Sequence, residues 1–105
     1  MTVYRPPTQS PTLFKDRIQQ MLLSLNTANL TVIIGDFNFN LLETPDHDIL
    51  QLMSHHGFRQ CVTQPTTDQG TLLDHMYINQ LVTVHTEVVD TYYSDHDIVC
   101  VTIEM

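Results

Sequence analysis

The sequence predicts a single mixed α/β (α+β) domain, in which two helices cover one face of a mostly antiparallel sheet. Three features support this class: two segments with apolar residues at helical spacing, a β-branched run between them, and several strand-like segments after the second. A chain of 105 residues, of which 42% are apolar, can bury one modest core. Each helix has one apolar stripe, so each can cover only one surface.

The first helix is expected over Pro11–Leu25, with Ser10 as its N-cap and Pro11 at the first helical position. Its apolar residues fall on one face: Phe14, Ile18, Met21, Leu22 and Leu25.

The second helix is expected over Pro45–His56, with Thr44 as its N-cap and Gly57 as its stop. Its inward face is formed by Ile49, Leu52 and Met53.

Strands account for the rest of the expected regular structure. The chain opens on "MTVY", a strand that has barely begun, and the β-branched run Leu30–Gly35 is typical of a strand covered on both faces. Four more strands are expected over Phe58–Val62, Leu72–Ile78, Leu81–Val89 and Ile98–Ile103.

Charge and composition exclude several classes of function. Twelve acidic residues against four Lys and Arg give a net charge of −8, which argues against binding nucleic acid by charge alone. A phosphate-bearing partner would therefore need a cation in between. No run is long enough to span a membrane. Cys61 and Cys100 lie in apolar runs, which predicts buried thiols in a reducing, intracellular compartment.

Three polar clusters interrupt otherwise apolar strands. Asp36 and Asn38 close the first buried strand, Asp74 stands inside an apolar strand, and Asp95 and His96 precede the last strand. A buried carboxylate needs a partner, and the economical solution is that the clusters converge at one edge of the sheet. Carboxylates and an amide suit Mg²⁺ or Mn²⁺. The chemistry inferred from them is metal-assisted attack on a phosphate ester.

Structural explanations remain open for each cluster taken singly. Asp36 and Asn38 can form a turn by bonding their own backbone, and Ser94 with Asp95 can cap a loop. Asp74 can pair with an arginine. It is the occurrence of all three clusters in one short chain that favours a functional site.

Four ordered motifs resemble a known family. "VYRPP", "VIIGDFNFN", "LLDHMYIN" and "YYSDH" are similar to the C-terminal half of the endonuclease/exonuclease/phosphatase superfamily, and in particular to endonuclease domains of mobile elements such as non-long-terminal-repeat retrotransposons. The resemblance implies half of a four-layer αββα sandwich, Mg²⁺ or Mn²⁺ as cofactor, DNA as the partner of the complete domain, and an intracellular, nuclear location.

The first two motifs carry three of the implied site residues and one further candidate, Arg5. The resemblance implies that Tyr4 helps to position the scissile phosphate, and that Asp36 and Asn38 handle the attacking water and a phosphate oxygen, with Asp36 as general base. Arg5 is a candidate for a contact with phosphate or DNA, although a loop arginine can be merely solvated.

The last two motifs carry the others. The resemblance implies that Asp95 lies at the metal, that His96 contacts the phosphate, and that Asp74 hydrogen-bonds His96. We therefore expect the side chains of Asp74 and His96 to lie within hydrogen-bond reach, at about 2.6–3.2 Å between heavy atoms. Asp97 is expected to be a solvated neighbour, and His75 an ordinary core or surface residue.

The family's other half contributes an asparagine and the glutamate that anchors the metal, and this sequence has no counterpart of that half. We therefore expect residues 1–105 to be the C-terminal part of a domain whose N-terminal half is missing. The main hypothesis is a DNA endonuclease with little activity in this form. The alternatives are a non-catalytic remnant or interaction module, and a phosphatase acting on small phosphorylated molecules.

Overall fold

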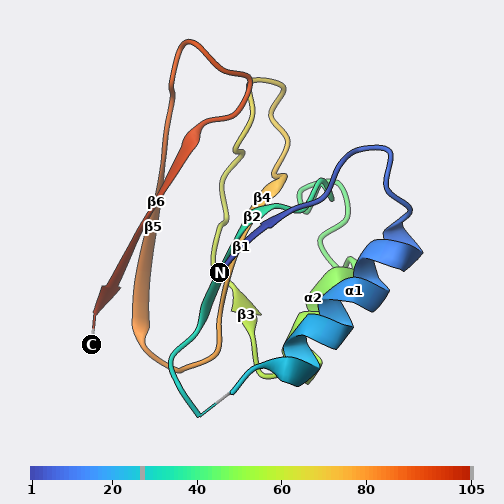
Figure 1. Cartoon of the computed structure of the whole chain (residues 1–105). Coiled ribbons are helices and arrows are strands. Elements are labelled where there is room, and N and C mark those ends of the chain that lie inside the picture. Colours follow the sequence, from blue (N-terminus) through green and yellow to red (C-terminus); the bar gives the residue numbers. More distant parts are fainter. Residues whose placement is uncertain (27, 105) are drawn as a thin grey trace.

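The computed structural model describes residues 1–26 and 28–104, and within them it contains two helices, a four-stranded sheet and a separate two-stranded hairpin (Figure 1). The elements in chain order are β1 (Thr2–Tyr4), α1 (Pro11–Ser24), β2 (Val32–Asp36), α2 (Asp48–His55), β3 (Arg59–Gln60), β4 (Asp74–Ile78), β5 (Thr83–Val89) and β6 (Ile98–Glu104). No helix in the described part of the chain is long and apolar enough to cross a membrane.

The expected mixed α/β class is confirmed, with both helices on one side of the four-stranded sheet (Figure 1). That sheet has the order β1-β2-β4-β3, in which β1 runs parallel to β2 and the other pairs are antiparallel. In the described part of the chain, the last two strands pair with each other as the β5–β6 hairpin and do not extend this sheet. The hairpin lies on the side of the sheet away from the helices (Figure 1).

Helix α1 forms as the sequence predicts. The side chain of Ser10 caps it by accepting a bond from the Leu13 N–H at 3.4 Å, and Pro11 is its first residue. Every fourth residue along one face of the helix, at Phe14, Ile18 and Leu22, is buried against the sheet.

Helix α2 begins three residues later than expected, at Asp48, so Thr44 is not its cap. His47 caps it instead, because its Nδ1 accepts a bond from the Ile49 N–H at 3.1 Å. The His47 ring also lies against Phe39, with 4.3 Å between the ring centroids. This tertiary contact overrides the local Thr-Pro signal, and residues 41–43 and 45–46 form turns before the helix.

Gly35 allows the two parallel strands to approach closely. A Cβ at this position would lie 1.7 Å from the carbonyl oxygen of Val3 in β1. Only glycine avoids that collision, so the residue before Asp36 sets how closely β1 packs beside β2.

The hairpin covers the core more thinly than the helices do. Its inward residues are half-buried valines, one isoleucine and Thr86, whereas alternate residues face outward. Cys100 is one of the outward residues and is exposed, so the expectation of two buried thiols is wrong for it; Cys61 is half-buried. Both cysteines are free.

Candidate functional site

Three of the predicted site residues stand in one row across neighbouring strands. Tyr4 in β1 is the register partner of Asp36 in β2, and Asp36 is the register partner of Asp74 in β4. Register partners share a face of the sheet, so these side chains meet at one end of the face opposite the helices. Tyr4 is 63% exposed, whereas the two carboxylates are mostly buried.

His96 reaches this row from the segment that precedes β6. Its backbone forms an isolated antiparallel bridge with Thr67, and the next residue, Asp97, donates its N–H to the Thr66 carbonyl at 2.8 Å. The Thr91 hydroxyl donates to the His96 carbonyl at 3.1 Å. Long-range hydrogen bonds therefore place a histidine 22 residues from Asp74 in sequence beside it.

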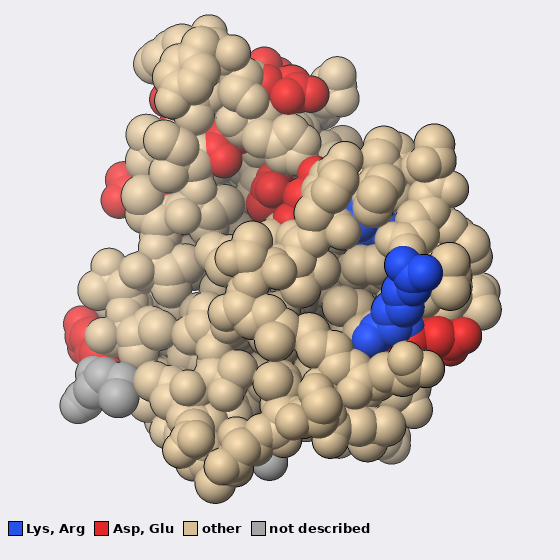
Figure 2. Space-filling view, viewed as in Figure 1, with Lys and Arg blue, Asp and Glu red and all other residues tan. Residues whose placement is uncertain are grey.

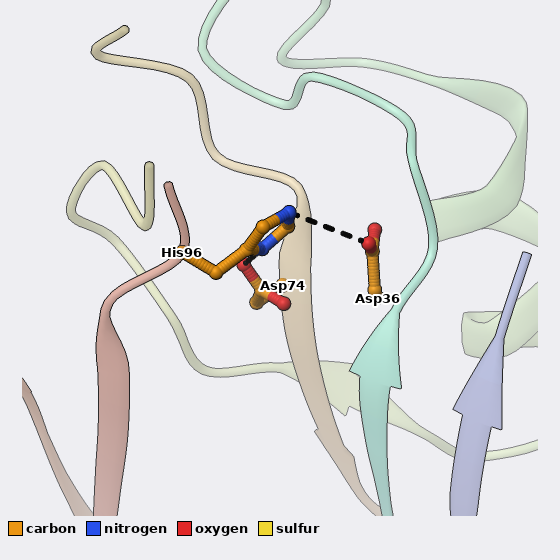
Figure 3. Close-up of side chains that lie close together, drawn as sticks. All are labelled: Asp36, Asp74 and His96. Carbon is orange, nitrogen blue, oxygen red and sulfur yellow. Dashed lines mark hydrogen bonds and ion pairs between the residues drawn. The ribbon is translucent and has the colours of Figure 1, made fainter. Parts of the chain in front are cut away.

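The imidazole of His96 lies between the carboxylates of Asp36 and Asp74, with one ring nitrogen near each (Figure 3). Its Nδ1 lies 2.8 Å from Asp74 Oδ2, and its Nε2 lies 3.6 Å from Asp36 Oδ2. The expected Asp74–His96 hydrogen bond is confirmed. The exposed fraction of the side chain is 19% for each aspartate and 33% for the histidine, so the group opens to solvent mainly at His96.

Burial and neighbouring charges change the protonation of this group. Burial, followed by the charge of Asp74, raises the pKa of Asp36. Burial alone would lower the pKa of His96, but the hydrogen bond and charge of Asp74, with the charge of Asp36, outweigh it and raise that pKa. A proton is therefore favoured on His96, where it offsets part of the charge of the two carboxylates.

Asn38 lies directly beside Asp36 in a left-handed backbone conformation, with φ of 57°. Its N–H donates to Asp36 Oδ1 at 3.0 Å, and its side-chain amide donates to the Arg5 carbonyl at 3.4 Å. Arg5 itself is only 7% exposed, and its guanidinium faces backbone carbonyls. Because the guanidinium is buried, the structure gives no support to the predicted contact between Arg5 and phosphate.

Asp95 is exposed and does not belong to the group formed by Asp36, Asp74 and His96, so its role at a metal stays a prediction. Asp97 is not the solvated neighbour that the sequence suggests. One of its carboxylate oxygens is buried without a hydrogen-bond partner, and it lies near Asp68 and Asp90. Figure 2 shows acidic side chains around the hairpin end of the molecule and in the hollow beside it.

Two supporting residues gave no clear signal in the sequence. His75 is fully buried, stacks on Phe37 at 4.8 Å between ring centroids, and bonds the Phe39 carbonyl at 2.9 Å. Thr66 is also fully buried, and its hydroxyl accepts the N–H groups of Leu73 and Asp74, each at 3.1 Å. A threonine in a polar loop has no pattern that would reveal such a long-range contact.

The same three side chains could hold a metal ion. One ligand atom from each of Asp36, Asp74 and His96 lies within 4.8 Å of the others. The two carboxylates are hard oxygen ligands that suit a divalent cation, and a cation would offset the burial that raises the pKa of Asp36. The donor set therefore fits a divalent cation held mainly by the carboxylates.

The family comparison agrees with this geometry. A search of curated proteins and a search of solved structures each found no match. A family model described as endonuclease-reverse transcriptase matches residues 1–100, and this span includes both aspartates and the histidine. The chain therefore belongs to the endonuclease-reverse transcriptase family.

Proposed function

We propose that this chain carries part of the active site of a divalent-metal-dependent DNA endonuclease that hydrolyses phosphodiester bonds. The observation that carries the proposal is the Asp74–His96 hydrogen bond of 2.8 Å, with Asp36 at 3.6 Å from the other ring nitrogen. An acid that orients a histidine beside a second, separately placed acid is an arrangement suited to acid–base chemistry at a phosphate.

Each residue of the group has a proposed role. Asp74 accepts the Nδ1–H of His96 and holds its ring in one orientation, which leaves Nε2 to donate to a phosphate oxygen. Water attacks phosphorus in line, the P–O bond to the leaving strand breaks, and Asp36 takes the proton of the attacking water. Without a bound cation, burial and the charge of Asp74 raise the pKa of Asp36, which makes it a stronger proton acceptor than an exposed aspartate.

Asn38 and Tyr4 lie beside Asp36. They are proposed to orient the attacking water and the scissile phosphate. A Mg²⁺ or Mn²⁺ ion held by the carboxylates would stabilise negative charge on the phosphate. Because the net charge is −8, such a cation also offers a route by which DNA can approach an acidic surface.

We further propose that full activity requires the other half of the family domain, including its metal-anchoring glutamate. Among the described residues, the group formed by Asp36, Asp74 and His96 offers two carboxylates to a cation that needs near-octahedral geometry. The 105-residue chain by itself is therefore expected to nick DNA slowly or not at all.

Nicking of supercoiled plasmid with Mg²⁺ or Mn²⁺ tests this function. We expect an extended protein that includes the other half to nick, and its His96→Ala variant to lose nicking. The matched control is His85→Ala, because His85 is also a histidine of the hairpin but is exposed and pairs with Glu104 at 3.3 Å. It should nick like the parent.

Other results would contradict parts of the proposal. Nicking by the extended protein that survives His96→Ala would refute the assigned site. Strong nicking by the 105-residue chain that disappears in His96→Ala would refute the need for the other half. Hydrolysis of a small phosphate ester without nicking would favour a phosphatase, and the absence of both activities would favour a non-catalytic module.

Asp36→Asn separates catalysis from folding. Burial and the charge of Asp74 oppose ionisation of Asp36, so a neutral amide should raise the melting temperature at pH 7 while it abolishes nicking by the extended protein. Thermal unfolding of the 105-residue chain and plasmid nicking by the extended protein measure the two effects. A lower melting temperature would show that the ion pair with His96 outweighs the burial of Asp36.

A further inference from the structure

Arg5 has an unusual environment for a charged residue. Its side chain is buried, and three nitrogens of its guanidinium donate to main-chain carbonyls: Nε to Phe37 at 2.8 Å, Nη1 to Gln9 at 2.7 Å and Nη2 to Asn38 at 2.7 Å. Its Cζ lies 4.2 Å from the ring centroid of Phe39. Among the described residues it takes part in no ion pair. Two of its three bonds are therefore directed at the loop that follows β2, and the third holds the segment before α1.

Two of these bonds define the backbone of one residue. The Phe37 carbonyl belongs to the peptide group before Asn38, and the Asn38 carbonyl belongs to the peptide group after it. Arg5 thus holds both peptide groups that flank Asn38, and the orientations of those groups set its φ and ψ. Asn38 needs such support, because φ of 57° is costly for a residue other than glycine.

The peptide group between Phe37 and Asn38 also connects Arg5 to the carboxylate of Asp36. Its carbonyl points to Arg5, so its N–H, which belongs to Asn38, points the opposite way and donates to Asp36 Oδ1 at 3.0 Å. The other oxygen of Asp36 is the one that lies 3.6 Å from His96 Nε2. Rotation of this peptide would release Asp36 from its orientation toward His96.

We propose that Arg5 is a positioning residue of the site: its guanidinium fixes the two peptide groups around Asn38 and thereby directs Asp36 toward His96. The catalytic meaning of this role rests on the proposed function, whereas the conformational role does not. Lysine cannot replace it, because an ammonium lacks the planar fork that reaches two carbonyls at once. Arg5 acts on the loop and not on the phosphate, contrary to the sequence-based expectation.

A double-mutant cycle on the 105-residue chain tests the conformational role. Arg5→Lys should lower the midpoint of urea unfolding. Asn38→Gly removes the steric cost of positive φ, so the shift caused by Arg5→Lys should shrink to about half or less in that background. The matched control background is Tyr92→Gly, because Tyr92 is the other described non-glycine residue with positive φ, at 65°. There the full shift should persist.

A spectroscopic readout distinguishes positioning from general stabilisation. A residue with positive φ gives a strong intraresidue cross-peak between its amide and α protons in nuclear Overhauser spectra. Arg5→Lys should weaken this cross-peak for Asn38 and speed exchange of its amide proton, while the signals of Tyr92 stay unchanged. Arg17→Lys, an exposed arginine of α1, is the matched substitution and should change neither.

Three results would overturn the proposal. One is an unfolding midpoint that falls equally in all three backgrounds, which would make Arg5 merely structural. Another is an unchanged Asn38 cross-peak in Arg5→Lys. The third is an extended, nicking-competent protein in which Arg5→Lys raises KM in a salt-dependent way with kcat unchanged, as a phosphate contact would. The first two need neither metal nor DNA, so they remain decisive even if the chain proves not to be a nuclease.

Discussion

The four-stranded sheet and the β5–β6 hairpin build the same site by different means. In β4, the four residues after Asp74 are all buried, whereas no residue of β5 or β6 is fully buried. Asp36 and Asp74 therefore stand on a packed sheet, while His96 is held mainly by hydrogen bonds at and beside it. The Thr91 hydroxyl donates to the His96 carbonyl, and the N–H of the adjacent Asp97 donates to the Thr66 carbonyl. Apolar packing of the sheet thus places Asp36 and Asp74, whereas hydrogen bonds place His96.

The two regions should also respond to acid in opposite directions. Burial lowers the pKa of His75, a buried residue of β4, to about 4. Asp74 and Asp36 instead raise the pKa of His96. A histidine with a lowered folded pKa contributes stability above pH 6.5 that is lost as pH falls. A histidine with a raised folded pKa contributes stability below pH 6.5 that is lost as pH rises through the folded value.

The largest effect is expected at His75. Between its unfolded pKa of 6.5 and its folded pKa of about 4, the free energy of unfolding should fall by about 3 kcal/mol as pH decreases. His75→Gln does not titrate and should flatten this loss, although it should lower stability at pH 7. Urea unfolding at several pH values measures the slope. His55→Gln, at an exposed histidine of α2, is the control, and an equal acid loss in both variants would argue against His75.

Thr66→Val should loosen the attachment of the β5–β6 hairpin to the four-stranded sheet. The change leaves the N–H groups of Leu73 and Asp74 without their acceptor, which should lower the free energy of unfolding by about 2 kcal/mol. Amide exchange should also accelerate at Asp97, which bonds the Thr66 carbonyl. Thr102→Val on the outward face of β6 is the control and should change little. Unchanged exchange at Asp97 would show that packing alone holds the hairpin.

Asp74→Asn should reduce the contribution of His96 to the pH dependence of stability. The hydrogen bond and charge of Asp74 are the main causes that raise the pKa of His96, so the variant should lower that pKa and reduce the stability gained below pH 6.5. A pH titration of the His96 ring protons by nuclear magnetic resonance measures the change directly. His85 provides an internal reference in the same spectra, and an unchanged His96 titration would contradict the hydrogen bond.

The smallest effect is expected at the acidic group near the hairpin loop. Asp68, Asp90 and Asp97 place carboxylate oxygens within 4.8 Å of one another, so their charges repel. Asp90→Asn should therefore raise the melting temperature slightly, and more at low salt than at high salt. Glu43→Gln removes one exposed charge elsewhere and is the control. An equal rise in both variants would point to net charge and not to this group.

Local patterns in the sequence determined much of the fold. The apolar spacing from Phe14 to Leu22 and the Ser-Pro start determined α1, because both signals act within a few residues. The β-branched run before Asp36 determined β2 in the same way. The start of α2 was predicted wrongly, since the contact between His47 and Phe39 lies outside the reach of a local Thr-Pro signal.

The site residues divide along the same line. The sequence by itself indicated that Asp36, Asp74 and His96 need partners, because charged groups beside apolar strands are costly when alone. Only the tertiary structure decided that Asp95 stays outside the group, that Asp97 turns inward, and that Arg5 faces carbonyls. These outcomes depend on which backbone groups residues distant in sequence present to each side chain, and residue type and spacing do not encode that arrangement.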